Sequence, residues 1–142
     1  MKKLSLLLFL SIALLSCNSK STESSTQGSE STPTQGSFIQ SVDATTFKKL
    51  VESGNGIILD VRTPGEVAQG YIPNATVIDI YRQDFMEKIA ELPKDKEVYV
   101  YCSAGVRSMQ AAKILQRNGY EKVYSLEDGL GTWVRSGYPL TK

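Results

Sequence analysis

One cysteine, Cys102, has the surroundings in this chain that most favour chemistry. In the stretch VYVYCSAGVRSMQAAKIL, residues 98–115, the run VYVYC predicts a buried strand that ends at Cys102. Residues 106–118 predict an amphipathic helix, so Cys102 lies just ahead of a helix N-terminus. The unpaired amides and the dipole at such a position favour negative charge. We therefore expect the Cys102 side chain to be a thiolate with a lowered pKa.

The loop between this strand and this helix is built to hold an anion. Ala104 and Gly105 are small, so the backbone can curl tightly, and Arg107 adds a fixed positive charge. The chain contains no histidine, which excludes Ser-His-Asp triads, Cys-His dyads and histidine-based metal sites. A cysteine nucleophile here must be activated by something other than imidazole. We expect no metal and no cofactor.

Short apolar runs alternate with amphipathic runs from residue 38 onward, and this alternation predicts the fold. We expect strands over 38–42, 57–61, 75–80, 98–102 and 122–126. We expect helices over 44–52, 66–69, 84–92, 106–118 and within 129–137, with Asp43 as an N-cap and Gly119 as a left-handed C-cap. The pattern predicts a three-layer α/β/α domain around a mostly parallel sheet. Asp60 and Cys102 fall at carboxyl ends of strands, where such sheets place their sites.

The first residues, MKKLSLLLFLSIALLSC, predict an exported protein. A basic start is followed by an apolar stretch from Leu4 to Leu15, which is too short to span a membrane at about 1.5 Å per residue. The end of this stretch resembles a bacterial lipobox, which implies a signal peptide over 1–16 and a lipid on Cys17. We therefore expect a lipid-anchored protein of the cell envelope, with its domain in the periplasm or on the outer surface.

Residues 18–37 contain no large apolar side chain, so we expect 17–37 to be a lipidated cysteine and a disordered tether, followed by a folded domain over 38–142. Without Lys2 and Lys3 the chain has 14 basic and 15 acidic side chains. This balance, with no basic run, argues against nucleic acid as a partner. If Cys17 carries lipid, Cys102 is the only free thiol, because the chain has two cysteines.

The stretch CSAGVRS resembles the active loop of a rhodanese, a thiosulfate or persulfide sulfurtransferase. Four residues separate Cys102 from Arg107, whereas tyrosine phosphatases and the related cell-cycle phosphatases use five. The resemblance implies a ring of amides too small for phosphate and sized for a cysteine that carries one extra sulfur. LEDGLGTWVRSGYP resembles the terminal motif of the family, and LDVRTPGEVAQGYIPNA resembles its other signature, at Asp60, Arg62, Glu66, Gly70, Ile72, Pro73 and Ala75.

The resemblance also implies the role of each residue. Cys102 would be catalytic: it attacks the outer sulfur of a small anionic donor, carries it as a persulfide, and yields it to cyanide or a thiol in a ping-pong reaction. Arg107 would either bind the donor or brace the loop against Glu66, and Asp60 with Arg62 would support the loop as an ion pair. The substrate-binding residues would be those of the loop, whose amides stabilise the sulfur: Ser103, Ala104, Gly105, Val106, Arg107 and Ser108.

Two other functions remain open at this point. The domain could be a persulfide-relay or protein-binding module with negligible turnover, which passes sulfur to a docked protein acceptor. It could also be a cysteine phosphatase or an arsenate reductase, which the length of the loop disfavours.

Overall fold

The computed structural model describes residues 36–142. The predicted signal peptide over 1–16, the lipid on Cys17 and all but the last two residues of the predicted 17–37 tether lie outside the described residues. Within 36–142, no helix combines the length and the apolar character needed to cross a membrane.

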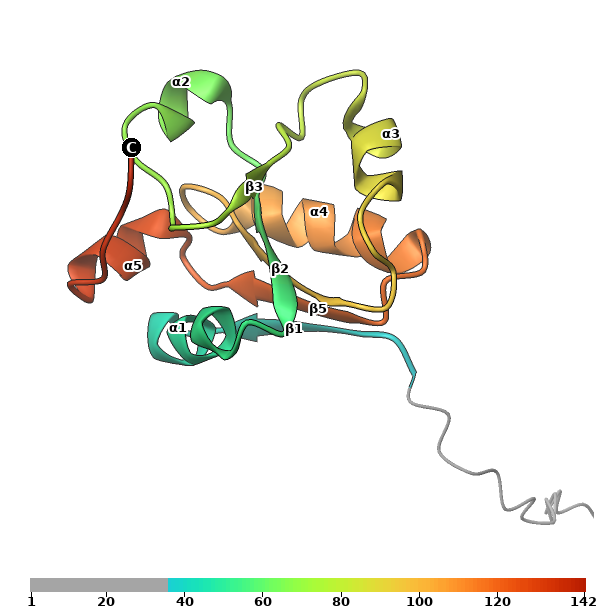
Figure 1. Ribbon diagram of the computed structural model, residues 1–142, viewed down its shortest axis with the longest axis horizontal. Coiled ribbons are helices and arrows are strands. Elements are labelled where there is room, and N and C mark those ends of the chain that lie inside the picture. The colour runs from blue at the N-terminus through green and yellow to red at the C-terminus, as the bar shows by residue number, and fades with distance from the viewer. Residues whose placement is uncertain (1–35) are drawn as a thin grey trace, which may run out of the picture. The chain divides into compact units, whose positions relative to one another are not determined.

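Strands and helices alternate along the described chain. The strands are β1 (Phe38–Val42), β2 (Gly56–Asp60), β3 (Thr76–Val77), β4 (Glu97–Tyr101) and β5 (Lys122–Leu126). The helices are α1 (Ala44–Ser53), α2 (Pro64–Val67), α3 (Phe85–Ala90), α4 (Val106–Arg117) and α5 (Leu130–Arg135). Figure 1 shows them as a sheet covered by helices.

The sheet has five strands in the order β1-β5-β4-β2-β3, and every pair of neighbours is parallel. All strands therefore end at the same edge, so the residues that follow β2, β4 and β5 lie beside one another. This confirms the predicted α/β class with a parallel central sheet.

The two faces of the sheet bury separate clusters, which makes the domain three layers deep. Along β4, Val98 and Val100 pack with residues of α3 and α4 on one face, and Cys102 belongs to this cluster. Tyr99 and Tyr101 point to the opposite face, where they pack with residues of α1 and α5. The alternation is the ordinary two-residue period of a strand.

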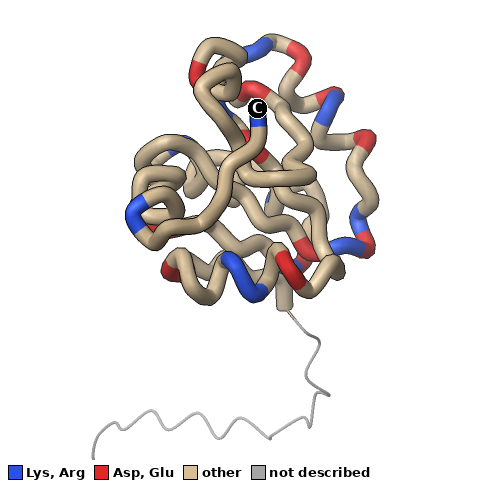
Figure 2. The backbone as a smooth tube through the Cα atoms, turned by 60° about the vertical axis from the view of Figure 1, so that its left-hand side comes forward, with Lys and Arg blue, Asp and Glu red and all other residues tan. Residues whose placement is uncertain are grey.

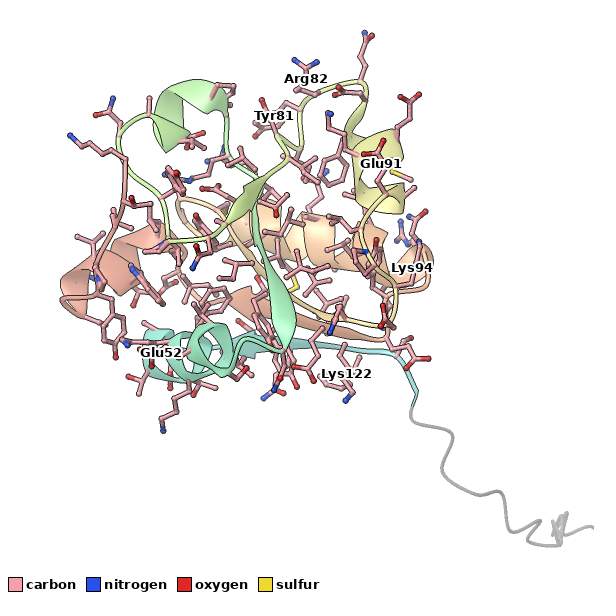
Figure 3. The ribbon with its side chains drawn as sticks, viewed as in Figure 1. Glu52, Tyr81, Arg82, Glu91, Lys94 and Lys122 are labelled. Atoms are coloured by element: carbon pink, nitrogen blue, oxygen red, sulfur yellow. The ribbon has the colours of Figure 1, made fainter. Side chains whose placement is uncertain are left out.

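The bounds differ from the expected ones mainly at the sheet edge. The strand predicted over 75–80 is wrong beyond Val77, because the edge strand β3 pairs with β2 through only Leu59 with Thr76 and Asp60 with Val77. The chain then leaves the ladder, and its next amide, that of Ile78, donates to the carbonyl of Asp60 at 2.9 Å. The turn that follows carries Tyr81 and Arg82, which Figure 3 labels near α3.

The other differences are small. The short helix α2 begins at Pro64 rather than at residue 66, and the predicted helix 84–92 is shorter, as α3. Strands β2 and β4 each begin and end one residue earlier than expected, so Cys102 is the first residue after β4. Figure 2 shows basic and acidic residues interspersed along the domain rather than gathered in runs of one sign.

Candidate active site

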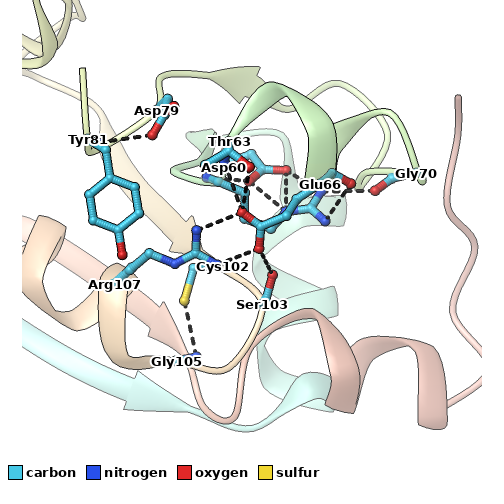
Figure 4. A network of polar contacts seen from close by, with 11 residues as sticks. Asp60, Thr63, Glu66, Gly70, Asp79, Tyr81, Cys102, Ser103, Gly105 and Arg107 are labelled. Carbon is cyan, nitrogen blue, oxygen red and sulfur yellow. Dashed lines mark hydrogen bonds and ion pairs between the residues drawn. The ribbon is translucent and has the colours of Figure 1, made fainter.

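Cys102 lies at the carboxyl end of β4, where the chain turns into the loop before α4. The Gly105 amide donates a hydrogen bond to Cys102 Sγ at 3.1 Å (Figure 4). Gly105 is the N-cap of α4 and has a left-handed backbone, with φ 86°, which glycine adopts without a side-chain penalty. The sequence therefore places a donor of the helix start directly on the sulfur.

The loop shifts the acid–base balance of the thiol towards the thiolate. Cys102 is 1% exposed, and burial alone raises the pKa of a thiol. Hydrogen bonds from the amides of Ser108, Ala104 and Gly105 and from the Ser108 hydroxyl outweigh this burial, so the pKa of Cys102 is lowered. The predicted thiolate environment is therefore present, although the side chain is covered.

A second, deeper hydroxyl supports Ser108. Ser108 and Ser125 are both buried, and the Ser125 hydroxyl donates to the Ser108 hydroxyl at 3.0 Å. The Ser108 hydroxyl has one proton, which it can donate either to the Cys102 sulfur or to the carbonyl oxygen of Gly105, 2.9 Å away. Ser125 comes from β5, so this contact joins the neighbouring strand to the floor of the loop.

Glu66 and Arg107 form the polar wall of the site. Arg107 Nη1 donates to Glu66 Oε2 at 2.7 Å, and Nη2 donates to Oε1 at 2.6 Å. The Ser103 hydroxyl donates to Oε1 at 2.6 Å, and the Thr63 hydroxyl donates to Oε2 at 2.8 Å. The Arg107 hydrogen bonds are the main reason that the pKa of Glu66 falls far below its usual range.

Asp60 and Arg62 form a buried ion pair behind this wall. Arg62 Nη2 lies 2.6 Å from Asp60 Oδ2, and both side chains are almost completely buried. The same guanidinium donates to the carbonyls of Gly70 at 2.9 Å and Glu66 at 3.3 Å. The pair therefore connects the end of β2 to α2, and α2 carries the carboxylate that holds Arg107.

The turn after β5 packs against the start of the loop. The Leu130 amide donates to the Cys102 carbonyl at 2.7 Å. At Gly129, a Cβ atom would lie 2.5 Å from the Ala104 nitrogen and 2.5 Å from the Cys102 oxygen. Only glycine allows this approach, so the course of the loop depends on the residue type at position 129.

Apolar side chains are exposed at the rim. Val106 is 77% exposed at the first turn of α4, and Tyr81 is 68% exposed. The Tyr81 ring faces Arg107, with 5.7 Å between its centroid and Arg107 Cζ. A groove of about 550 Å³ runs beside the loop and α4, lined among others by Gly105, Met109 and Asp128.

The residues predicted from the sequence come together here. The amides of Ala104, Gly105 and Ser108 act on the sulfur, whereas the Ser103 hydroxyl binds Glu66. Val106 is at the rim, Asp60 and Arg62 are paired behind the wall, and Arg107 is bound to Glu66. The lipidation site Cys17 lies outside the described residues.

Sequence reasoning did not single out Thr63, Tyr81, Ser125 or Gly129. A signal existed for Ser125, which is a hydroxyl residue near the carboxyl end of the otherwise apolar strand KVYSL. Gly129 belongs to the terminal motif already noted. Nothing in the local sequence marks Tyr81, which reaches the site only because the chain turns after β3.

Comparison with known proteins identifies the family. The rhodanese-like domain family matches residues 43–136. A sulfurtransferase from Allochromatium vinosum is 37% identical over 93 residues, which cover 66% of this chain and 85% of that protein. A putative sulfur carrier protein from Bacillus subtilis is 31% identical over 108 residues, which cover 75% of this chain and 57% of that protein.

A solved structure agrees with this relationship. The crystal structure of a rhodanese-related protein from Thermoplasma volcanium superposes with a TM-score of 0.64 at 31% identity, over 72% of this chain and 97% of that one. The segment that the family model matches, residues 43–136, contains the Cys102 loop. The chain belongs to the rhodanese-like domain family, and the proteins related to it include sulfurtransferases.

Proposed function

We propose that this protein is a sulfurtransferase that moves a sulfane sulfur from thiosulfate or a persulfide to a thiol or cyanide through a persulfide on Cys102. The observation that carries the proposal is the Gly105 amide 3.1 Å from Cys102 Sγ. A thiolate held by backbone donors is a nucleophile at neutral pH. The same donors stabilise the negative terminal sulfur after transfer.

The reaction runs in two displacements. The thiolate attacks the outer sulfur of the donor, a new bond forms from Sγ to that sulfur, and the donor fragment leaves with the electron pair of the broken bond. The acceptor then attacks the terminal sulfur and restores the thiolate. Because Cys102 is 1% exposed, each displacement needs a local movement of the covering side chains.

Mass spectrometry of the purified full chain tests this proposal. After incubation with a sulfur donor, tryptic digestion places Cys102 on the peptide Glu97–Arg107, which should gain the mass of one sulfur atom. Cys102→Ser should abolish this gain and also thiocyanate formation. Cys17→Ser is the matched control, because it removes the other cysteine and should leave both unchanged. Full activity of Cys102→Ser would exclude the mechanism.

A sulfur relay with little turnover is the second candidate. It is favoured by the exposed apolar side chains Tyr81 and Val106 at the rim, which suit contact with a protein acceptor, and by the similarity to a putative sulfur carrier. Rapid loading of Cys102 with slow release to cyanide and small thiols would identify this function. A cysteine phosphatase or arsenate reductase would instead hydrolyse a chromogenic phosphate ester or reduce arsenate, and we expect neither.

We further propose that the domain is held at the cell envelope by a lipid on Cys17, facing the periplasm or the outer surface. The support is the leader sequence that ends at this cysteine. Fractionation of cells should find the wild-type chain in the membrane fraction, and Cys17→Ser should shift it to the soluble or secreted fraction. Equal distribution of the two proteins would refute the anchor.

A further inference from the structure

The positive charge of the loop is already neutralised. The two terminal nitrogens of Arg107 each donate to a different carboxylate oxygen of Glu66, Nη1 to Oε2 at 2.7 Å and Nη2 to Oε1 at 2.6 Å. A bidentate pair of this kind is among the stronger and more specific ion pairs. An anion that needed this guanidinium would have to displace two charge-assisted hydrogen bonds from it.

Glu66 is also held firmly on its own side. Its two oxygens accept from the hydroxyls of Ser103 and Thr63 and from the Thr63 amide. The carboxylate is therefore fixed beside α2 as well as beside the loop. Arg107 moreover lies against the Tyr81 ring, so leaving Glu66 would also cost this contact.

The surroundings of the loop combine apolar side chains with charges of both signs. The exposed side chains beside it include Val106 at the start of α4 and Val134, which shares a hollow with Ser103. Arg135 is also exposed, and its guanidinium lies close to Gly131 of the same hollow. The groove on α4 is lined by two acidic residues, Glu127 and Asp128, and by one basic residue, Lys113. The groove therefore adds no net positive charge.

We propose that the preferred donor is an organic persulfide, R–S–S–H, rather than the thiosulfate dianion. This inference rests on the proposed function, since it concerns the sulfur that Cys102 receives. The Cys102 thiolate attacks the outer sulfur, the new Sγ–S bond forms, and the S–S bond of the donor breaks. The leaving group is the thiolate R–S⁻, which takes the bonding pair, so the step needs no oxidant or reductant.

Loading rates with two donors test the proposal. The rate constant for formation of the Cys102 persulfide in the full chain is measured with thiosulfate and with freshly generated 2-hydroxyethyl persulfide, which has an uncharged R group. We expect the organic persulfide to load faster by about tenfold or more, the factor that one missing charge-assisted contact implies. Thiosulfate loading as fast or faster would overturn the proposal.

A substitution at the carboxylate tests the cause. Glu66→Gln keeps the shape but frees the Arg107 charge, so the ratio of thiosulfate to persulfide loading should rise about tenfold. Glu91→Gln is the matched control, because it changes the net charge equally and should leave the ratio unchanged. Glu91 is exposed at the end of α3 and is labelled in Figure 3. An unchanged ratio in Glu66→Gln would overturn the proposal.

Salt dependence gives a test that needs no variant. If Arg107 were free to bind the dianion, thiosulfate loading of the wild-type chain would slow as ionic strength rises from about 0.01 to 0.15 M. With the charge neutralised by Glu66, we expect a flat or rising rate, and a marked decrease would count against the proposal. Failure of Cys102 to load from either donor would instead refute the sulfurtransferase function itself.

Discussion

Gly129→Ala should destabilise the domain and displace the active loop. Gly129 has φ 63° and ψ −157°, a region that is essentially restricted to glycine and costs about 1–3 kcal/mol for other residues. The new Cβ would also lie 2.5 Å from the Ala104 nitrogen, the Cys102 oxygen and the Ser103 carbon. These are backbone atoms, so relief requires the loop to move, at a further cost of about 1–3 kcal/mol.

The expected loss in free energy of unfolding is therefore about 2–6 kcal/mol, a large share of the stability of a small domain. Urea unfolding measures it through the fluorescence of Trp133, which is the only tryptophan of the chain and is buried. The native alkylation rate of Cys102 should change as well, because the Leu130 amide that follows Gly129 binds the Cys102 carbonyl.

Substitutions at two other glycines separate the cost of the left-handed backbone from the cost of the steric clash. Gly119 also has a left-handed backbone, with φ 87°, but its Cβ would meet nothing within 4 Å, so Gly119→Ala should cost about 1–2 kcal/mol. Gly65 in α2 has open space and no positive φ, and its substitution by Ala should change stability by less than about 0.5 kcal/mol. If Gly129→Ala cost no more than Gly119→Ala, the argument from close packing on the loop would be refuted.

Three further predictions concern buried polar groups. Asp60→Ala should cost about 3–5 kcal/mol in urea unfolding, because it leaves Arg62 buried without its partner; a cost below about 1 kcal/mol would contradict this. Ser125→Ala should raise the pKa of Cys102, measured by the pH dependence of alkylation, because Ser108 loses the hydroxyl that orients it; an unchanged profile would exclude the role. Folding lowers the pKa of the Cys102 thiol, so ionisation of this thiol stabilises the native state. The contribution is fully present above the thiol pKa of the unfolded chain, about 8.5, and it is lost as pH falls through the thiol pKa of the folded chain. The stability of wild type relative to Cys102→Ser should therefore increase with pH and level off above about 8.5, and a constant difference would show that the thiolate is not favoured.

Local sequence signals were sufficient for most of the fold. Asp43 caps α1 as expected, accepting from the Thr46 amide at 2.7 Å, and Gly119 has the left-handed conformation expected after α4. These features depend on residues close in the chain. The strand expected over 75–80 was predicted too long, because its end depends on residues that are distant in the chain. Its apolar pattern continues, but the edge strand ends where its partner β2 ends, and that limit is set by tertiary pairing.

In the site, too, the features that depend on neighbouring residues could be predicted, whereas those that depend on tertiary contacts could not. The cysteine, the small loop and the helix start are contiguous, so a sequence pattern contains the whole amide cradle. Arg107 and Glu66 are 41 residues apart, and the sequence left open whether Arg107 faces the donor or the carboxylate. The strand order decides this, because β4 is flanked by β2 and β5.

That order also explains why the loop has two differently built walls. On the β2 side, α2 carries Glu66, which accepts hydrogen bonds from Arg107 and neutralises its charge. From the β5 side come Ser125 and Gly129, which support the floor of the loop and set its path. Under the proposal that thiosulfate is disfavoured, the first wall would set the preference for a donor, and the second would set whether the amides point at the sulfur. Substitutions on the β2 side should therefore change donor preference, whereas those on the β5 side should change the acidity of Cys102 for every donor alike.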